Sequence, residues 1–512
     1  MAQSGAHDDG SSIIVPMQRA YTGTKFILYS SLADTPWNDL GVDGLLDRLN
    51  TTLGTSYTLD SPSISSALED CIAHNHDFGT AHAHLRGSWQ KWDTMQAEMR
   101  RREARARDMR QEALVGNRIV QPYMVPRRIW DLYSNRERVE VQTPINGYEW
   151  PVPIPKDTNL DRVRTEMLNL GLEYVWLDVF CLRQNGGPGE ALRAEEWKVD
   201  VPTIGHIYNI SSTVCCLSGL GRPLSLNTGT WESDRSWFRR AWTLQEPGRR
   251  PVIAGDTPDG PLHARPIDKE ENYRDELLTR FHKQLRSLDN IKPMFSSVFQ
   301  MLADIQNRVS TNPVDKVAGL SFPLMSGEIP AYYEKQSVED AWTELVNTMI
   351  GWNRRQLFFL YPAPGNASRK WCPSWEQVMT TPLPVDRLPT KTEMSGEACD
   401  DWYEGFCIES GFVRGLAVGD ADGVNMQGEL VVEDANGKHK FNIIAAHQYP
   451  IPEDSYVLIG EMVSLMEYWV VGRRLPEKRF EKVSVFKMTE DKEKIKMLDD
   501  LSIAIKSRSL LV

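Results

Sequence analysis

The sequence lacks any long hydrophobic run, since nowhere do about 18 apolar residues follow one another as a membrane-spanning helix requires. Its start, MAQSGAHDD, also lacks the charged-then-apolar order of a secretory signal. The seven cysteines are odd in number and irregularly spaced, which indicates reduced thiols and no disulfide framework. We therefore expect an intracellular, cytoplasmic protein with no membrane span.

Positive charge and nucleotide-binding loops are also scarce. The formal net charge is -12, which argues against a nucleic-acid partner because neutralising phosphates needs a positive field. Gly219-Leu220-Gly221 lacks the third glycine of a dinucleotide fingerprint, and no Walker loop occurs. We expect neither a standard nucleotide-binding fold nor a resident cofactor.

What is present is the composition of a globular protein of several domains, with 512 residues, 41% hydrophobic and 25% charged. We predict an α/β protein that also carries a helical module and a β-rich domain. The predicted parts are a disordered segment (1–20), a helical N-terminal module (21–125), an α/β domain (126–330), a helical extension with a linker (331–390) and a C-terminal β-rich domain (391–512).

In the N-terminal module, apolar residues recur at helical spacing, and Ser61-Pro62 is typical of a helix start. Residues 89–114 interleave arginines with acidic residues, which predicts an exposed helix crossed by ion pairs. Four histidines lie within residues 74–84. They suit either a metal site or a loop of exposed histidines; the scarcity of nearby thiols favours the loop.

The α/β domain is predicted from a sequence of alternating helices and strands. Residues 157–170 form an amphipathic helix with Gly171 as its stop, and YVWLDVFC at 174–181 predicts a buried parallel strand. A helix from Glu195 to Tyr208 and a strand at 212–218 follow. This order implies a doubly wound parallel sheet. Asp178 then either faces a ligand at the carboxyl end of its strand or caps the following turn.

The stretch SWFRRAWTLQE at 236–246 combines two indoles, two guanidiniums, an amide and a carboxylate. We predict that it begins a helix, which Pro247-Gly248 ends. Helical spacing would group several of these side chains on shared faces, and this mixture suits a site better than a core.

Several of these segments together resemble the fungal heterokaryon-incompatibility (HET) domain, over roughly residues 126–375. The most specific match is RAWTLQE at 240–246, preceded by Trp237. The other matching segments are YVWLD at 174–178 with Cys181 and Gln184, Glu195-Glu196 ahead of Ile207-Tyr208, NPVDKVAGL at 312–320 and WCPSW at 371–375.

The resemblance implies a fungal domain of non-self recognition and programmed cell death, with a flavodoxin-like parallel sheet similar to the Toll/interleukin-receptor (TIR) domain. Trp242-x-Leu244-x-Glu246 is similar to the element of plant TIR domains whose glutamate cleaves NAD. Glu246 then becomes the catalytic carboxylate and NAD its substrate. The implied substrate-binding residues are Asp178, Gln184, Trp237, Arg239, Arg240, Trp242 and Gln245.

Two functions remain open from the sequence. In the first, the domain is an NAD-consuming cell-death effector that is activated by self-association or by a protein partner, with no metal. In the second, it is a non-catalytic interaction module, whose tryptophans build the core while Glu246 pairs with an arginine one turn earlier.

In the C-terminal part, residues 335–352 predict an amphipathic helix and residues 487–506 a solvated one. Between a proline-rich linker and this tail lie six short alternating or apolar runs. They predict a small antiparallel β-barrel or sandwich, in which we find no catalytic constellation.

Overall fold

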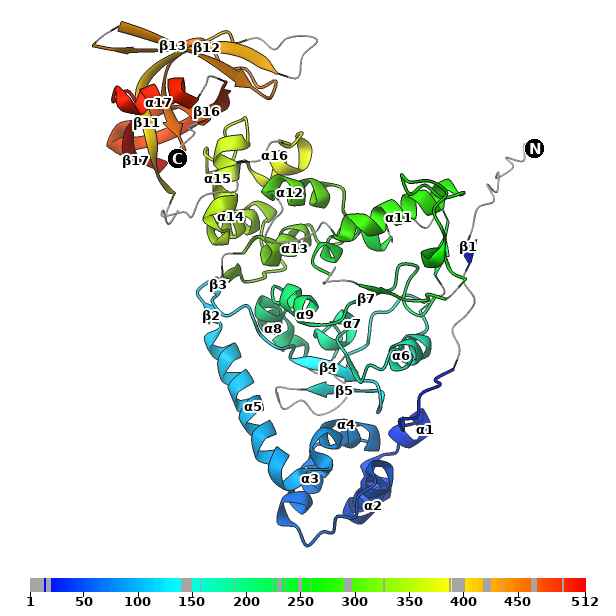
Figure 1. Cartoon of the computed structure of the whole chain (residues 1–512). Coiled ribbons are helices and arrows are strands. Elements are labelled where there is room, and N and C mark those ends of the chain that lie inside the picture. Colours follow the sequence, from blue (N-terminus) through cyan, green and yellow to red (C-terminus); the bar gives the residue numbers. More distant parts are fainter. Residues whose placement is uncertain are drawn as a thin grey trace, which may run out of the picture. The chain divides into compact units, whose positions relative to one another are not determined.

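The computed structural model describes residues 13–14, 20–139, 150–156, 158–187, 189–222, 224–227, 233–234, 236–246, 251–257, 259–289, 297–325, 327–385, 388, 401–417, 425–435, 437–461, 467–489 and 492–512 (Figure 1). The chain divides into two compact units. Unit 1 comprises residues 1–291, 308–322 and 327–335, and unit 2 comprises residues 292–307, 323–326 and 336–512. The expected disorder of residues 1–20 concerns a segment that, apart from residues 13, 14 and 20, lies outside the described residues.

Unit 1 begins with a cluster of helices around an apolar core. These are α1 (Ser30–Ala33), α2 (Trp37–Leu53), α3 (Pro62–Ala73), α4 (Phe78–Trp89) and α5 (Trp92–Glu112). Leu49, Leu68 and Trp89 are fully buried in that core. Helix α3 begins at Pro62 directly after Ser61, as the sequence predicts. Helix α2 ends at Gly54, whose φ of 67° favours glycine.

Helix α5 is the long charged helix that the sequence predicts. Glu98 pairs with Arg102 at 3.0 Å and with Arg101 at 3.9 Å, and all three side chains are exposed. Figure 1 shows α5 running from the region of α3 and α4 to a hairpin of β2 (Leu114–Val115) and β3 (Arg118–Ile119). Strand β3 also pairs with β10 (Ile329–Pro330).

The rest of unit 1 mixes short strands with helices. The strands are β1 (Ile13–Ile14), β4 (Arg128–Asp131), β5 (Arg136–Val139), β6 (Tyr174–Val175), β7 (Val214–Cys215), β8 (Ser225–Leu226) and β9 (Val252–Ile253). Strand β4 pairs antiparallel with both β5 and β6, and β1 antiparallel with β8, whereas β7 pairs parallel with β9. Within the described residues these strands form separate small sheets.

Helices and 3-10 turns connect these strands. They are α6 (Leu160–Asn169), α7 (Asp178–Cys181), η1 (Glu190–Leu192), α8 (Arg193–Asp200), α9 (Ile204–Ile210), η2 (Trp237–Arg239), η3 (Trp242–Leu244), η4 (Pro261–His263), α11 (Glu276–Asp289) and α13 (Val314–Leu324), of which residues 314–322 belong to unit 1. Helix α6 ends before Gly171, at φ 79°, as predicted. The prediction of a single helix from Glu195 to Tyr208 is wrong, because residues 201–203 separate α8 from α9.

The continuous buried strand expected at 174–181 is also wrong. Strand β6 ends at Val175, and the backbone turns into α7 at Asp178. The amides of Phe180 and Cys181 donate to the carbonyl of Leu177 at 3.0 and 2.8 Å. Because these donors are satisfied within one turn, they are not free for a sheet partner. The apolar composition is that of a strand, but Asp178 begins a helical turn.

Unit 2 combines a helical part with a seven-stranded sheet. Its helices are α12 (Val298–Gln306), α14 (Val338–Thr348), α15 (Gly351–Leu360), α16 (Trp375–Thr380) and α17 (Lys492–Asp500). Helix α14 lies within the predicted helix at 335–352, and α17 within the predicted tail helix. The sequence of strands, with one 3-10 turn, is β11 (Trp402–Arg414), β12 (Met426–Asp434), β13 (Gly437–Ala445), β14 (Asp454–Gly460), β15 (Tyr468–Leu475), η5 (Pro476–Lys478), β16 (Arg479–Met488) and β17 (Ile505–Leu511).

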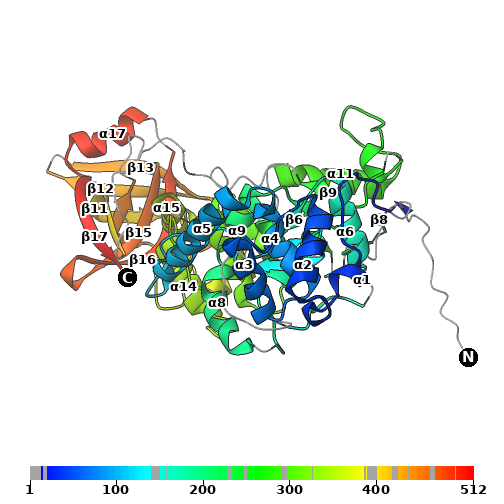
Figure 2. The same ribbon diagram turned by 90° about the horizontal axis from the view of Figure 1, so that it is seen from below.

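The six runs expected as strands in this part correspond to β11–β16, in the sheet order β12-β13-β16-β15-β14-β11-β17. The sheet closes on itself because β12 also pairs with β11. It is mixed and not purely antiparallel, since β16 and β17 are parallel. Helix α17 (red in Figure 2) contributes Ile495 and Leu498 to the core of the sheet. Among the helices of the described residues, none is long and apolar enough to cross a membrane.

Candidate functional site

The stretch 236–246 forms two 3-10 turns instead of the expected helix. Arg240 separates η2 from η3 in an extended conformation, at φ -79° and ψ 140°. It forms a parallel bridge with Val309, in which the amide of Ala241 donates to the carbonyl of Val309 at 2.9 Å. The helical faces expected here therefore do not exist. The expected helix end at Pro247-Gly248 lies outside the described residues.

Glu246 is joined directly to Trp237. The indole nitrogen of Trp237 donates to Glu246 Oε2 at 2.5 Å. Trp237 is itself only 6% exposed and packs with Phe238 in an apolar cluster. The core interpretation of this tryptophan is thus correct for its ring, while its polar edge orients the carboxyl group of Glu246.

The surroundings of Glu246 change its acidity. Burial raises the pKa of Glu246 to about 7, and the Asp178 carboxylate adds to the rise. The guanidiniums of Arg240 and Arg308 and the hydrogen bond from Trp237 act in the opposite direction. A carboxyl with this pKa exchanges its proton near neutral pH, which is the property of a general acid or base.

Tyr208 belongs to the same cluster, although the sequence offered it only as part of a matching segment. Burial raises the pKa of the Tyr208 phenol well above its ordinary value, and the charges of Glu246 and Asp178 raise it further. Its ring meets that of Trp176 edge-on, with centroids 5.7 Å apart. The candidate site therefore comprises Glu246, Asp178, Arg240 and Tyr208.

Asp178 occupies the first turn of α7, where its Oδ1 accepts the amide of Val179 at 2.8 Å. This bond reaches only the next residue, whereas the capping interpretation expected Asp178 to cap the turn at 183–187. Its charge also acts on Glu246, so Asp178 is part of the electrostatic surroundings of that carboxyl group.

Arg308 supports the turn that carries the site, and no sequence pattern singled it out. Its Nη1 donates to the carbonyl of Arg240 at 2.9 Å and also to the hydroxyl of Thr243. That hydroxyl lies within hydrogen-bonding distance of two carbonyls, those of Trp237 at 2.8 Å and Arg240 at 2.7 Å, and shares its one proton between them. Arg308 is only 7% exposed. It therefore fixes the backbone from which Arg240 and Glu246 project.

The remaining predicted site residues engage other partners. Gln245 is buried and donates to the carbonyl of Ala318 at 2.9 Å, and the indole of Trp242 donates to Asp315. Arg239 is exposed and pairs with Asp234 at 3.5 Å. Gln184 donates to the carbonyl of Leu182 at 2.8 Å. Within the described part of the chain, Glu246 accepts its hydrogen bond from Trp237.

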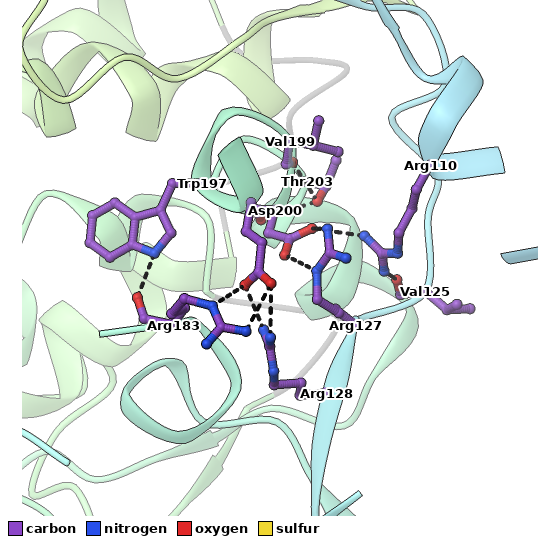
Figure 3. A network of polar contacts seen from close by, with 10 residues as sticks. Arg110, Val125, Arg127, Arg128, Arg183, Trp197, Val199, Asp200 and Thr203 are labelled. Carbon is purple, nitrogen blue, oxygen red and sulfur yellow. Dashed lines mark hydrogen bonds and ion pairs between the residues drawn. The ribbon is translucent and has the colours of Figure 1, made fainter. Parts of the chain in front are cut away.

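The acidic pair Glu195-Glu196 has two different environments. Glu195 is exposed and pairs with Lys198 at 2.6 Å. Glu196 is buried, and both of its oxygens accept from Arg128 at 2.9 Å and from Arg183 at 3.1 Å. Asp200, one turn later, accepts from Arg110 at 2.8 Å and from Arg127 at 2.7 Å (Figure 3).

This network of buried ion pairs joins four parts of the chain (Figure 3). Arg110 lies on α5 and Arg128 on β4, with Arg127 directly before that strand. Arg183 lies two residues after α7, and Glu196 and Asp200 lie on α8. Trp150 lies against two of its guanidiniums, 5.1 Å from that of Arg128 and 5.3 Å from that of Arg183. Although burial alone would raise the pKa of Glu196, Arg128 and Arg183 hold it below the ordinary value. Glu196 therefore stabilises the fold around the site.

Three of the four histidines at 74–84 form a stack. The ring centroids of His74 and His76 are 5.6 Å apart, and those of His76 and His84 are 5.2 Å apart. Burial lowers the pKa of His76 and brings that of His82 to about 4. Among the described residues, no group of three or more histidine, cysteine or acidic side chains is arranged to hold a metal ion.

Comparison of the chain with models of protein families, with curated proteins and with solved structures found no match.

Proposed function

We propose that this protein is a HET-type effector of non-self recognition and cell death, and that it cleaves the bond between nicotinamide and ribose in NAD with Glu246 as the catalytic carboxylate. The observation that carries the proposal is the raised pKa of Glu246, about 7, in a cluster with Asp178, Arg240 and Tyr208. Perturbed carboxyl groups beside a second carboxylate are typical of sites that act on glycosidic bonds.

The proposed reaction requires few catalytic groups. Nicotinamide leaves as a neutral ring and takes the electron pair of the bond, so a ribosyl oxocarbenium ion remains. The ionised Glu246 stabilises this cation, and a water molecule then adds to the same carbon. The proton of that water passes to Glu246 and from there to solvent. The products are nicotinamide and ADP-ribose.

The neighbours of Glu246 have separate roles in this proposal. Arg240 is exposed and has the charge to pair with the pyrophosphate. Burial, with a smaller contribution from the charge of Asp178, raises the pKa of Glu246 to about 7, so that near neutral pH the carboxylate can accept the proton of the water. Trp237 and Arg308 are positioning residues, because they hold the carboxyl group and its turn. Gln184 and Gln245 hold backbone carbonyls, Trp242 holds the side chain of Asp315, and Arg239 is the second candidate for the pyrophosphate.

The proposed function includes a relationship to the TIR fold. Its support is the parallel pair β7–β9 and the mixture of helices and strands along the domain. The antiparallel pairs of β4 with β5 and β6 are no part of a flavodoxin-like sheet. Self-association in the cytoplasm, as the way in which the effector is activated, belongs to the same proposal.

The proposal is tested by incubating purified protein with NAD and measuring nicotinamide release, with and without crosslinking. We expect release by the wild type and a loss of about 100-fold or more in Glu246→Gln. Glu195→Gln is the matched control, because Glu195 is an exposed glutamate of the same region. Release that persists in Glu246→Gln would contradict the site assignment.

A non-catalytic interaction module is the second candidate. It is favoured by the internal bonds of Trp237, Trp242 and Gln245, which suit a packed core. No release from wild type, even when it is crosslinked into assemblies, together with measurable self-association in sedimentation, would support this function instead.

A further inference from the structure

Asp178 and Tyr208 belong to the candidate site, yet the proposed reaction gives neither of them a partner on the substrate. Asp178 lies in the first turn of α7, Tyr208 lies on α9, and Glu246 lies two residues after η3. All three residues are half-buried, so they lie at the boundary between the core and solvent. A small molecule can therefore reach them without opening the core.

The three side chains are close enough to act on one another electrostatically. The charges of Glu246 and Asp178 both raise the pKa of the Tyr208 phenol, and the charge of Asp178 raises that of Glu246. Asp178 accepts the amide of Val179 at 2.8 Å, and Glu246 accepts the indole of Trp237 at 2.5 Å. Within the described part of the chain, no hydrogen bond joins any two of the three. Both carboxyl groups therefore keep acceptor capacity, because each has two oxygens.

The phenol of Tyr208 is a hydrogen-bond donor for this cluster. Burial and the two neighbouring carboxylates raise its pKa well above the ordinary value, so it keeps its proton at neutral pH. Its ring is positioned by Trp176, which it meets edge-on with centroids 5.7 Å apart. Among the described residues, no acceptor is hydrogen-bonded to the hydroxyl. The cluster thus offers one donor and two carboxyl groups to a ligand.

Two neighbouring carboxyl groups limit what this ligand can be. A phosphate would meet charges of its own sign, so the pyrophosphate of a dinucleotide is disfavoured at this point. Vicinal hydroxyls fit, because they donate to carboxylates and accept from a phenol. The nicotinamide riboside half of NAD has such a pair of hydroxyls and a positive charge on its pyridinium ring. A metal ion fits less well, since no group among the described residues is arranged to hold one.

We propose that Asp178 and Tyr208 bind the 2′- and 3′-hydroxyls of the nicotinamide ribose and so select a ribosyl substrate for Glu246. The carboxylate accepts from the diol, and the phenol donates to one of its oxygens. This inference rests on the proposed cleavage of NAD for the identity of the substrate. Hydrogen bonds to the hydroxyl beside the reacting carbon strengthen as positive charge develops on a sugar, so these contacts would also speed the reaction.

The test measures the binding of NAD to full-length Glu246→Gln by isothermal titration calorimetry, because this variant should turn NAD over slowly. NAD is compared with an analogue that lacks both hydroxyls of the nicotinamide ribose. Asp178→Asn and Tyr208→Phe are each made in the Glu246→Gln background. We expect each to weaken the binding of NAD about tenfold and to leave the binding of the analogue unchanged.

Tyr123→Phe is the matched control in the same background. It also removes a phenol hydroxyl, from a ring that packs on His206 of α9 with centroids 5.3 Å apart and is 57% exposed. We expect this variant to bind NAD as Glu246→Gln does. Thermal melts followed by circular dichroism show which variants fold; Tyr208→Phe keeps its ring and decides the matter if Asp178→Asn does not fold.

The inference is overturned if Glu246→Gln does not bind NAD, or if Tyr208→Phe weakens NAD and the analogue equally or weakens neither. Nicotinamide release by the wild type without the selective loss would retain the proposed function and reject the ribose assignment. The selective loss without any nicotinamide release would support the ribose assignment and reject the proposed cleavage. The two proposals therefore fail separately.

Discussion

Trp237 donates its indole N–H to Glu246 at 2.5 Å across nine positions of the chain, so one residue serves both the core and the candidate site. A hydrogen bond to the charged form of a carboxyl favours that form. Trp237 therefore keeps the pKa of Glu246 lower than burial alone would make it.

The substitution Trp237→Phe removes this bond and retains an aromatic ring. We expect the pKa of Glu246 to rise further above about 7, because the bond from Trp237 lowers it in the wild type. The measurement is a carboxyl titration by nuclear magnetic resonance with labelled glutamate, which does not depend on activity. If the protein cleaves NAD, the rate of release should rise with pH, and its midpoint should move to higher pH in the variant. An unchanged titration would show that the bond contributes nothing to the acidity of Glu246.

Glu246 also makes the stability of the protein depend on pH. Its pKa is raised from 4.5 to about 7 in the folded protein, so folding favours the protonated form. This contribution to stability is complete below pH 4.5 and is lost as the pH rises through about 7. At pH 8 we expect Glu246→Gln to be more stable than the wild type by up to about 3 kcal/mol, with the difference shrinking toward pH 4.5. Urea denaturation at both pH values measures it; a difference that does not change with pH would contradict the assigned pKa.

Sequence patterns predict correctly those helices and strands whose formation depends on residues close together in the sequence. The interleaved charges of α5 and the glycine that ends α6 at φ 79° act within a few residues, and both helices are present as expected. The strands from β11 to β16 are each long enough to show alternation or an apolar run. Their predicted positions were therefore correct, although the parallel pairing of β16 with β17 was not predicted.

The candidate site is determined by residues that are distant in sequence. Arg240 interrupts the expected helix because it pairs with Val309, and Arg308 then holds the turn through the carbonyl of Arg240. No periodicity within 236–246 encodes these contacts. The two compact units also alternate along the chain, since residues 292–307 belong to unit 2 and residues 308–322 to unit 1. Domain boundaries drawn as consecutive ranges of the sequence therefore cannot describe these units.

Lys482 in unit 2 gives a second dependence on pH, of opposite sign. It is buried and donates to the carbonyl of Phe358 at 2.8 Å, near the end of α15, and to those of Leu357 and Trp371 at 3.4 Å. Burial lowers the pKa of Lys482 to about 7. The unfolded chain thus binds a proton that the folded protein lacks between about pH 7 and 10.5, so stability increases over this range. We expect Lys482→Met to remove this increase, of the order of a few kcal/mol, in denaturation curves at pH 7 and pH 10; an identical pH dependence in both proteins would contradict the prediction.

Glu196 is the member of the ion-pair network whose loss should cost most. In Glu196→Gln the guanidiniums of Arg128 and Arg183 lose the charge to which both donate, while they remain buried. Breaking a buried pair by removing one partner typically costs about 3–5 kcal/mol. Glu195→Gln, next in the chain, removes only an exposed pair with Lys198 and should cost less than about 1 kcal/mol. Urea denaturation of the two variants measures the contrast. Equal effects would mean that the buried network contributes no more than a surface pair.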